Sequence, residues 1–90
     1  MDLLIKTRRL LRRAFPRPAQ IDLEEFHGIM GEVTSRAFRG LNGTQRQAML
    51  RTALKDNLKP QEWKQIGLIV AITPEERKLK AELDSLCNGY

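Results

Sequence analysis

The hydrophobic and polar positions of residues 3–15 follow a helical period. Wound at about 100° per residue, the segment places its leucines on one side and most of its basic residues on the other. Pro16 and Pro18 end the pattern, because each lacks an amide hydrogen and biases the preceding residue out of the α region. The sequence therefore predicts an amphipathic helix over 3–15 and a short extended linker over 16–21.

The next apolar pattern also indicates a helix. Asp22 and Glu25 have the spacing of a capping box, and apolar residues then recur at helical intervals. Gly28 and Gly31 each cost up to about 1 kcal/mol inside a helix relative to alanine. A second helix crossing closely at these glycines would make that cost tolerable. We therefore predict a helix over 22–39.

Three further helices are predicted in the C-terminal part of the chain. Thr44 and Thr73 are suited to cap helices, and Pro60 and Pro74 are suited to the first helical turn. The expected ranges are 44–57, 60–71 and 74–87.

The apolar run 66–72 has an alternative interpretation. It is rich in β-branched residues, so it could instead be one buried strand. The helix is preferred because no second strand is predicted, and a lone strand is not stable.

These patterns predict an all-α fold, a single small bundle of about five helices. Residues 1–90 are expected to form one domain, with a basic helix at 3–15, a linker at 16–21 and a helical body at 22–87. The expected core consists of the apolar residues on the inner stripes: Leu10, Phe26, Ile29, Met30, Val33, Phe38, Leu50, Leu54, Trp63, Ile66, Val70, Leu79, Leu83 and Leu86.

The net charge of +5 is concentrated at the N-terminus. Residues 1–18 hold six basic residues and one acidic residue, whereas 19–90 hold ten of each sign. The predicted helix over 3–15 contains no glutamate to neutralise its arginines at i+4, so an external anion is expected. The candidate anion-binding residues are Lys6, Arg8, Arg9, Arg12, Arg13 and Arg17.

The leading functional hypothesis is a small regulatory protein that contacts nucleic acid through these six side chains. One alternative is a protein–protein adaptor or homodimer. Its candidate partner-binding residues are Leu3, Leu4, Leu10 and Leu11. A third is association with an anionic membrane surface. No transmembrane segment is predicted, since no apolar run approaches ~18 residues.

The segment 63–77 resembles two known helical motifs. Its small residues, Gly67 and Ala71, would let two helices cross closely, as in the helix-turn-helix of DNA-binding repressors. Glu75 and Glu76 open the would-be recognition helix, and phosphates would repel them. The same register is similar to the death-fold interaction domains, where a tryptophan-containing helix, a short turn and an acidic-capped helix lie in a six-helix bundle. That resemblance implies a protein-interaction role.

Enzymatic chemistry is not expected. The chain has one histidine, His27, and one cysteine, Cys87, with no paired carboxylate–histidine arrangement and no phosphate-binding loop. We predict no catalytic residues, no metal ligands and no cofactor. A single cysteine is compatible with a reducing compartment, and the expected location is intracellular, in the cytoplasm.

Overall fold

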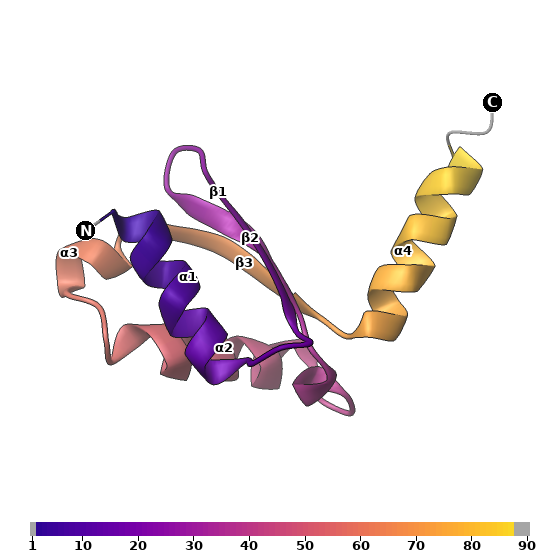
Figure 1. Ribbon diagram of the computed structural model, residues 1–90, viewed down its shortest axis with the longest axis horizontal. Helices are drawn as coiled ribbons and strands as arrows, with labels where there is room; N and C mark the ends of the chain where they lie inside the picture. Colours follow the sequence, from indigo (N-terminus) through magenta and orange to yellow (C-terminus); the bar gives the residue numbers. More distant parts are fainter. Residues whose placement is uncertain (1, 88–90) are drawn as a thin grey trace.

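The computed structural model describes residues 2–87, with side chains described as far as Asp84. Its elements in chain order are α1 (Leu3–Ala14), β1 (Gln20–Glu25), β2 (Ile29–Thr34), the 3-10 turn η1 (Arg36–Phe38), α2 (Gly43–Lys55), α3 (Pro60–Trp63), β3 (Ile66–Ile72) and α4 (Pro74–Cys87), as Figure 1 shows. The predicted all-α bundle is therefore wrong, because the chain is an α/β domain with a three-stranded sheet. The helices predicted at 3–15, 44–57 and 74–87 are present close to their predicted bounds.

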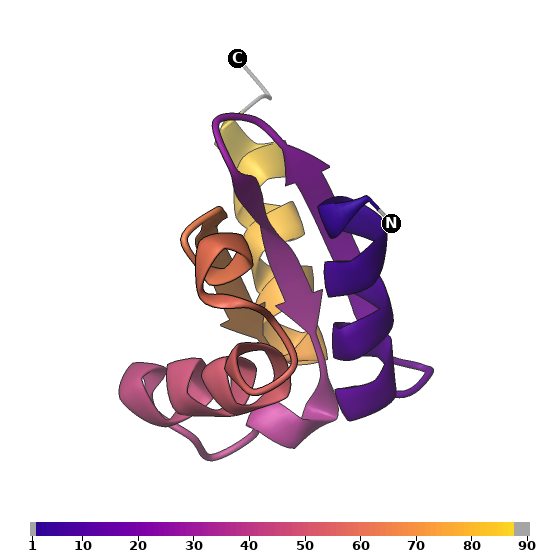
Figure 2. The same ribbon diagram turned by 90° about the vertical axis from the view of Figure 1, so that its left-hand side faces the viewer.

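The sheet has the strand order β1-β2-β3. β1 and β2 form an antiparallel hairpin, and β3 pairs parallel to β2 after a crossover through α2 and α3. α1 packs on β1 and on α2, and α2 packs on β3, so both helices cover one face of the sheet. Figure 2 shows α1 alongside the hairpin.

The predicted helix over 22–39 is instead a hairpin followed by a 3-10 turn. Ile21 and Leu23 alternate with Asp22 and Glu24 along β1, so this strand presents one apolar face and one acidic face. Asp22 therefore does not cap a helix. Gly31 fits a tight strand pairing, since a Cβ at this position would lie 2.9 Å from the Cα of Leu23.

The predicted helix over 60–71 is also wrong beyond Trp63. Residues 66–72 form β3, whose partner is the hairpin strand β2. The free edge of β3 is capped by side chains from α2. Gln47 Nε2 donates to the carbonyl of Ile69 at 2.9 Å, and Arg46 Nη1 donates to that of Ala71 at 3.2 Å.

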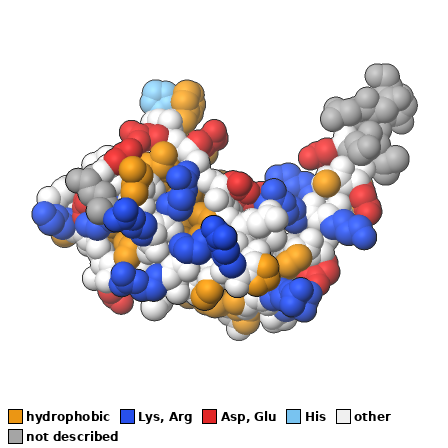
Figure 3. All heavy atoms as spheres, in the orientation of Figure 1, with side chains coloured by type: hydrophobic (Ala, Val, Ile, Leu, Met, Phe, Trp, Pro, Cys, Tyr) orange, Lys and Arg blue, Asp and Glu red, His pale blue; other side chains and the backbone are white. Residues whose placement is uncertain are grey.

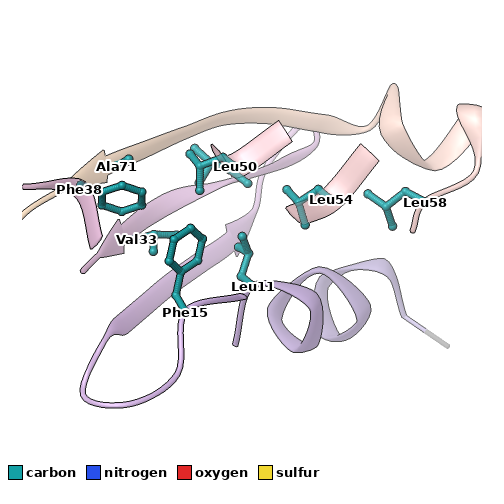
Figure 4. Close-up of a cluster of buried hydrophobic side chains, with 9 residues drawn as sticks. Leu11, Phe15, Val33, Phe38, Leu50, Leu54, Leu58 and Ala71 are labelled. Carbon is teal, nitrogen blue, oxygen red and sulfur yellow. The ribbon is translucent and has the colours of Figure 1, made fainter. Parts of the chain in front are cut away.

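The hydrophobic core lies between the sheet and the two helices α1 and α2. Phe15 and Phe38 pack with ring centroids 5.0 Å apart and ring planes tilted by 49°, and Leu11 is fully buried beside them (Figure 4). Five predicted core residues are confirmed as buried: Ile29, Val33, Phe38, Leu50 and Leu54. Four more are partly buried: Leu10, Met30, Trp63 and Ile66.

Four predicted core residues lie on the surface instead. Phe26 is 66% exposed in the turn of the hairpin, and Val70 is 38% exposed on the outer face of β3. Leu79 and Leu83 are 55% and 53% exposed, because α4 makes no extensive contact with another described helix or strand. The side chain of Leu86 falls outside the described part of the chain.

Candidate functional site

α1 is a packed layer of the domain and not a projecting cationic arm. Thr7 and Leu11 are fully buried, while Leu3 and Leu10 pack against the core cluster. Leu4 is half-buried. Leu11 is therefore not available to a partner in this conformation, because it already fills the space between α1 and the sheet.

Of the six basic residues predicted to bind an anion, Arg12 and Arg17 lie along one open hollow beside the linker. Lys6 Nζ forms an ion pair with Glu62 Oε1 of α3 at 2.9 Å. Arg12 Nη1 donates to the carbonyl of Ala19 at 2.6 Å, which fixes the linker to the end of α1. The other four are exposed on α1 and the linker: Arg8, Arg9, Arg13 and Arg17.

Ion pairs and capping hydrogen bonds hold the start of α4 in place. Thr73 and Glu76 form a capping box, in which Thr73 N donates to Glu76 Oε1 at 2.7 Å and Glu76 N to Thr73 Oγ1 at 3.2 Å. Arg46 of α2 reaches Glu76 at 2.6 Å, and Arg39 pairs with Glu75. Backbone and arginine hydrogen bonds hold the pKa of Glu76 below its ordinary value of 4.5.

Three glutamates with lowered pKa values, two of them in this network, predict a loss of stability in acid. A carboxylate whose folded-state pKa is lowered stabilises the fold above its unfolded pKa, and the contribution disappears as the pH falls through the folded value. The pKa values of Glu62, Glu75 and Glu76 are all lowered from 4.5. We expect the free energy of unfolding, measured in urea, to decline below about pH 4.5. In the Glu76→Gln variant this decline should be smaller than in the wild type, by up to about 1 kcal/mol. An identical pH profile in this variant would contradict the assignment.

The outer face of the sheet is not covered by α1 or α2. Leu68 and Val70 of β3 point to this side and are 62% and 38% exposed. Met30 of β2 lies next to them, and Glu32 pairs in register with Val70. These side chains, the neighbouring part of β1 and Arg8 of α1 line an open groove of about 500 Å³.

Acidic side chains border the apolar strip that Leu68, Val70 and Met30 form on this face. Asp22, Glu24 and Glu32 lie on the same face of β1 and β2, since Asp22 is the register partner of Glu32. Two of them form ion pairs with basic residues of α4. Arg77 Nη1 lies 3.0 Å from Asp22 Oδ2, and Lys80 Nζ lies 3.4 Å from Glu32 Oε2.

A second hollow of about 590 Å³ lies where the linker meets the first turns of α4. Pro16, Pro18 and Pro74 contribute apolar walls, while Arg36 and Lys78 contribute charge. The Arg17–Pro18 peptide bond beside it is cis. Among the side chains described, which end at Asp84, no three His, Cys, Asp or Glu are grouped so as to hold a metal ion. No described helix is long and apolar enough to span a membrane.

No protein-family model and no curated protein sequence matches the chain. The solved structures that are similar to it include two that carry BolA-like names. BolA1 from Arabidopsis thaliana superposes with a TM-score of 0.67 at 17% sequence identity, covering 84% of this chain and 96% of that one. The chain has a BolA-like fold. A bol-like protein from Babesia bovis superposes with a TM-score of 0.60 at 21% identity, covering 90% of this chain and 95% of that one.

The BolA-like fold overturns the leading functional hypothesis and its description as a nucleic-acid-binding helical bundle. That hypothesis required a cationic arm beside a neutral helical body, whereas α1 is one layer of an α/β domain. The resemblance of 63–77 to a helix-turn-helix and to a death fold also fails, because residues 66–72 within it form β3 and not a helix.

The outer-face residues Leu68 and Val70 were not recognised as a site from the sequence. Their alternation with the buried Ile69 and Ala71 was the available indication, since a strand with one solvated face has this period. The run was assigned to a helix, in which the same residues have no common outward face.

Proposed function

We propose that this BolA-like domain is a non-catalytic interaction module that binds a polypeptide partner on the outer face of its sheet. The observation that carries the proposal is the exposure of Leu68 and Val70 on that face. A cytoplasmic location remains part of the proposal, supported by the single cysteine.

Exposed apolar side chains in a row are unusual on a solvated sheet face. An antiparallel or mixed sheet with one free face normally carries polar residues there. Leu68 and Val70 are two residues apart on one strand, so their side chains are neighbours, and Met30 extends the strip onto β2. Contiguous apolar surface of this kind favours contact with another protein.

The charges around the strip indicate the chemistry of the partner. Asp22, Glu24 and Glu32 border the strip, and Arg77 and Lys80 engage two of them. The carboxylate of Glu24 is exposed, and no salt bridge joins it to another described side chain. A segment that presents apolar side chains together with lysine or arginine would match this surface, with the charges setting orientation more than affinity.

The double substitution Leu68→Lys/Val70→Lys tests the proposal. We expect retention of bound proteins from an extract of the source cells to fall by about tenfold or more, because the apolar contacts are lost and the lysines must be desolvated. Quantitative mass spectrometry of the retained proteins is the measurement. Folding should be preserved, since both side chains already face solvent, and circular dichroism and thermal unfolding check this.

A matched control uses a similarly exposed apolar residue on α1, which covers the opposite face of the sheet. Ile5 of α1 is 43% exposed, and Ile5→Lys should leave the retained proteins unchanged. If the double variant, while folded, retains the same proteins as the wild type, the outer face is not the binding surface.

A further inference from the structure

The second hollow, of about 590 Å³, lies at the junction of α4 with the body of the domain. α4 extends away from the body there, and lysine and arginine side chains lie on both sides of the junction (Figures 1 and 3). The linker forms one wall of the hollow, and the start of β1 and the end of β2 form another. One face of α4 forms the third wall, because its lining residues recur at the i, i+3, i+4, i+7 spacing of a single helix face: Pro74, Arg77, Lys78 and Ala81.

Hydrogen bonds fix each wall of the hollow in place. Arg12 Nη1 donates to the carbonyl of Ala19 at 2.6 Å, which holds the end of the linker. Ser35 N donates to the carbonyl of Ile72 at 3.0 Å, which joins the end of β2 to the end of β3. The capping box at Thr73 then sets the direction in which α4 leaves the sheet. The hollow is therefore formed before a ligand arrives, and binding does not have to order its walls.

The uncharged lining of the hollow is largely apolar. It includes three prolines and two alanines: Pro16, Pro18, Pro74, Ala19 and Ala81. Proline rings are rigid and their nitrogens carry no hydrogen to donate, so these walls make few polar demands on a ligand. The volume of the hollow lies within the range of about 300–1,000 Å³ that small-molecule sites occupy. A ring system or short hydrocarbon chain would lose contact with water and gain contact with these walls.

The charged residues that line the hollow are all positive. They are Arg36, Arg77 and Lys78, and no aspartate or glutamate lies among the lining residues. Arg77 is already paired with Asp22 at 3.0 Å. Arg36 and Lys78 are exposed, and no salt bridge joins either of them to another described side chain. Two such cations match a doubly negative group, and a phosphate monoester carries a charge of about −1.5 to −2 at neutral pH.

We propose that this hollow binds a small phosphate monoester whose other end is an apolar ring or chain. The apolar end lies against the proline and alanine walls, and the phosphate oxygens accept hydrogen bonds from Arg36 and Lys78. The hollow shares no lining residue with the groove on the outer face of the sheet. This site is therefore independent of the polypeptide-binding function proposed for that face.

Titration with naphthyl phosphate tests the proposal, because this probe joins an apolar ring system to a phosphate. Amide chemical shifts of the isotope-labelled full chain, recorded by NMR near neutral pH, are the measurement. We expect a dissociation constant between about 10 μM and 1 mM, with the largest shifts at residues 34–36 and 74–81. Naphthol and inorganic phosphate each carry only one end of the probe, and each should bind at least about tenfold more weakly.

Charge reversal at the two unpaired cations tests the phosphate contact. Arg36→Glu/Lys78→Glu should weaken binding of naphthyl phosphate at least about tenfold, because the probe then meets two carboxylates. Arg51→Glu/Lys55→Glu is the matched control, since it changes the net charge by the same amount at exposed positions of α2. The control should bind within about twofold of the wild type at physiological salt, which screens distant charges.

Filling the hollow tests the apolar contact without changing a charge. Ala81→Trp should weaken binding at least about tenfold, because its ring takes the space of the ligand. Leu79→Trp adds a ring on the far side of α4 and should bind as the wild type does. Both positions are exposed, so each variant should fold, and its amide spectrum checks this.

Three results would overturn the proposal. They are the absence of shifts with naphthyl phosphate at millimolar concentration, equally tight binding of inorganic phosphate or naphthol, and unchanged affinity in Arg36→Glu/Lys78→Glu or Ala81→Trp. Leu68→Lys/Val70→Lys should bind the probe as the wild type does, since the outer face of the sheet takes no part. Failure of this proposal would therefore leave the function proposed for the outer face unaffected.

Discussion

The Phe38→Ala variant is expected to lose about 3–5 kcal/mol of its free energy of unfolding, which is most of the stability of a domain this small. Phe38 is fully buried, and its ring packs at a tilt against that of Phe15 at the junction of η1, α1 and the sheet. Alanine would remove these contacts and leave a cavity that the surrounding elements can fill only partly.

Urea unfolding followed by circular dichroism measures the effect of this variant. Phe26→Ala is the matched control, because it deletes the same side chain from a position that is 66% exposed. It should change the free energy of unfolding by no more than about 0.5 kcal/mol. Equal losses in the two variants would show that Phe38 is not part of the core.

Gly31→Ala is expected to have the second large effect, a loss of at least about 2 kcal/mol. The added Cβ would lie within contact distance of the carbonyl oxygen of Asp22 and 2.9 Å from the Cα of Leu23. Both are backbone atoms of β1, so the hairpin strands would have to separate to admit the methyl group. The pairing of β1 with β2 would then weaken over its whole length.

Gly43→Ala is the control for this substitution. No atom lies within 4 Å of a Cβ built at Gly43, which begins α2. Alanine there should leave stability unchanged or raise it slightly, because it restricts the unfolded chain more than glycine does. Thermal unfolding of both variants checks the contrast, and a Gly31→Ala variant as stable as the wild type would contradict the tight pairing.

The hairpin was predicted as a helix because its apolar residues satisfy two periods at once. Residues 26, 29, 30 and 33 recur at helical intervals, whereas Ile21 and Leu23 alternate with acids in the two-residue period of a strand. Gly28, which has a positive φ of 122°, and His27, at 53°, form the turn that divides the segment. Helical spacing was favoured because the glycines were assigned to a close helix crossing.

The error in β3 followed from the error in the hairpin. Residues 66–72 were recognised as a possible strand, and the strand was rejected because it had no predicted partner. Its partner, β2, lies more than 30 residues earlier in the chain. A parallel pairing of this kind depends on contacts that no local window contains.

For the candidate surfaces too, the sequence predicted the local spacing of side chains but not their contacts with distant residues. The basic side of α1 was evident from its spacing, but the ion pair of Lys6 with Glu62 joins residues 56 positions apart. Leu79 and Leu83 were correctly placed on one stripe of a helix and wrongly placed in the core, because the pattern cannot show whether anything covers the stripe.

The sequence by itself determined the positions of α1, α2 and α4, the cap at Thr73, the burial of Phe38, Leu50 and Leu54, and the location of the net charge. These follow from hydrogen bonds and side-chain spacing within a few residues of the chain. Only the tertiary structure decided that 20–25, 29–34 and 66–72 are strands, that α1 is a packed layer, and that the outer sheet face and the apolar stripe of α4 remain uncovered. Strand pairing and burial depend on groups that are distant in the sequence, and their free energy exists only once the chain has brought those groups together.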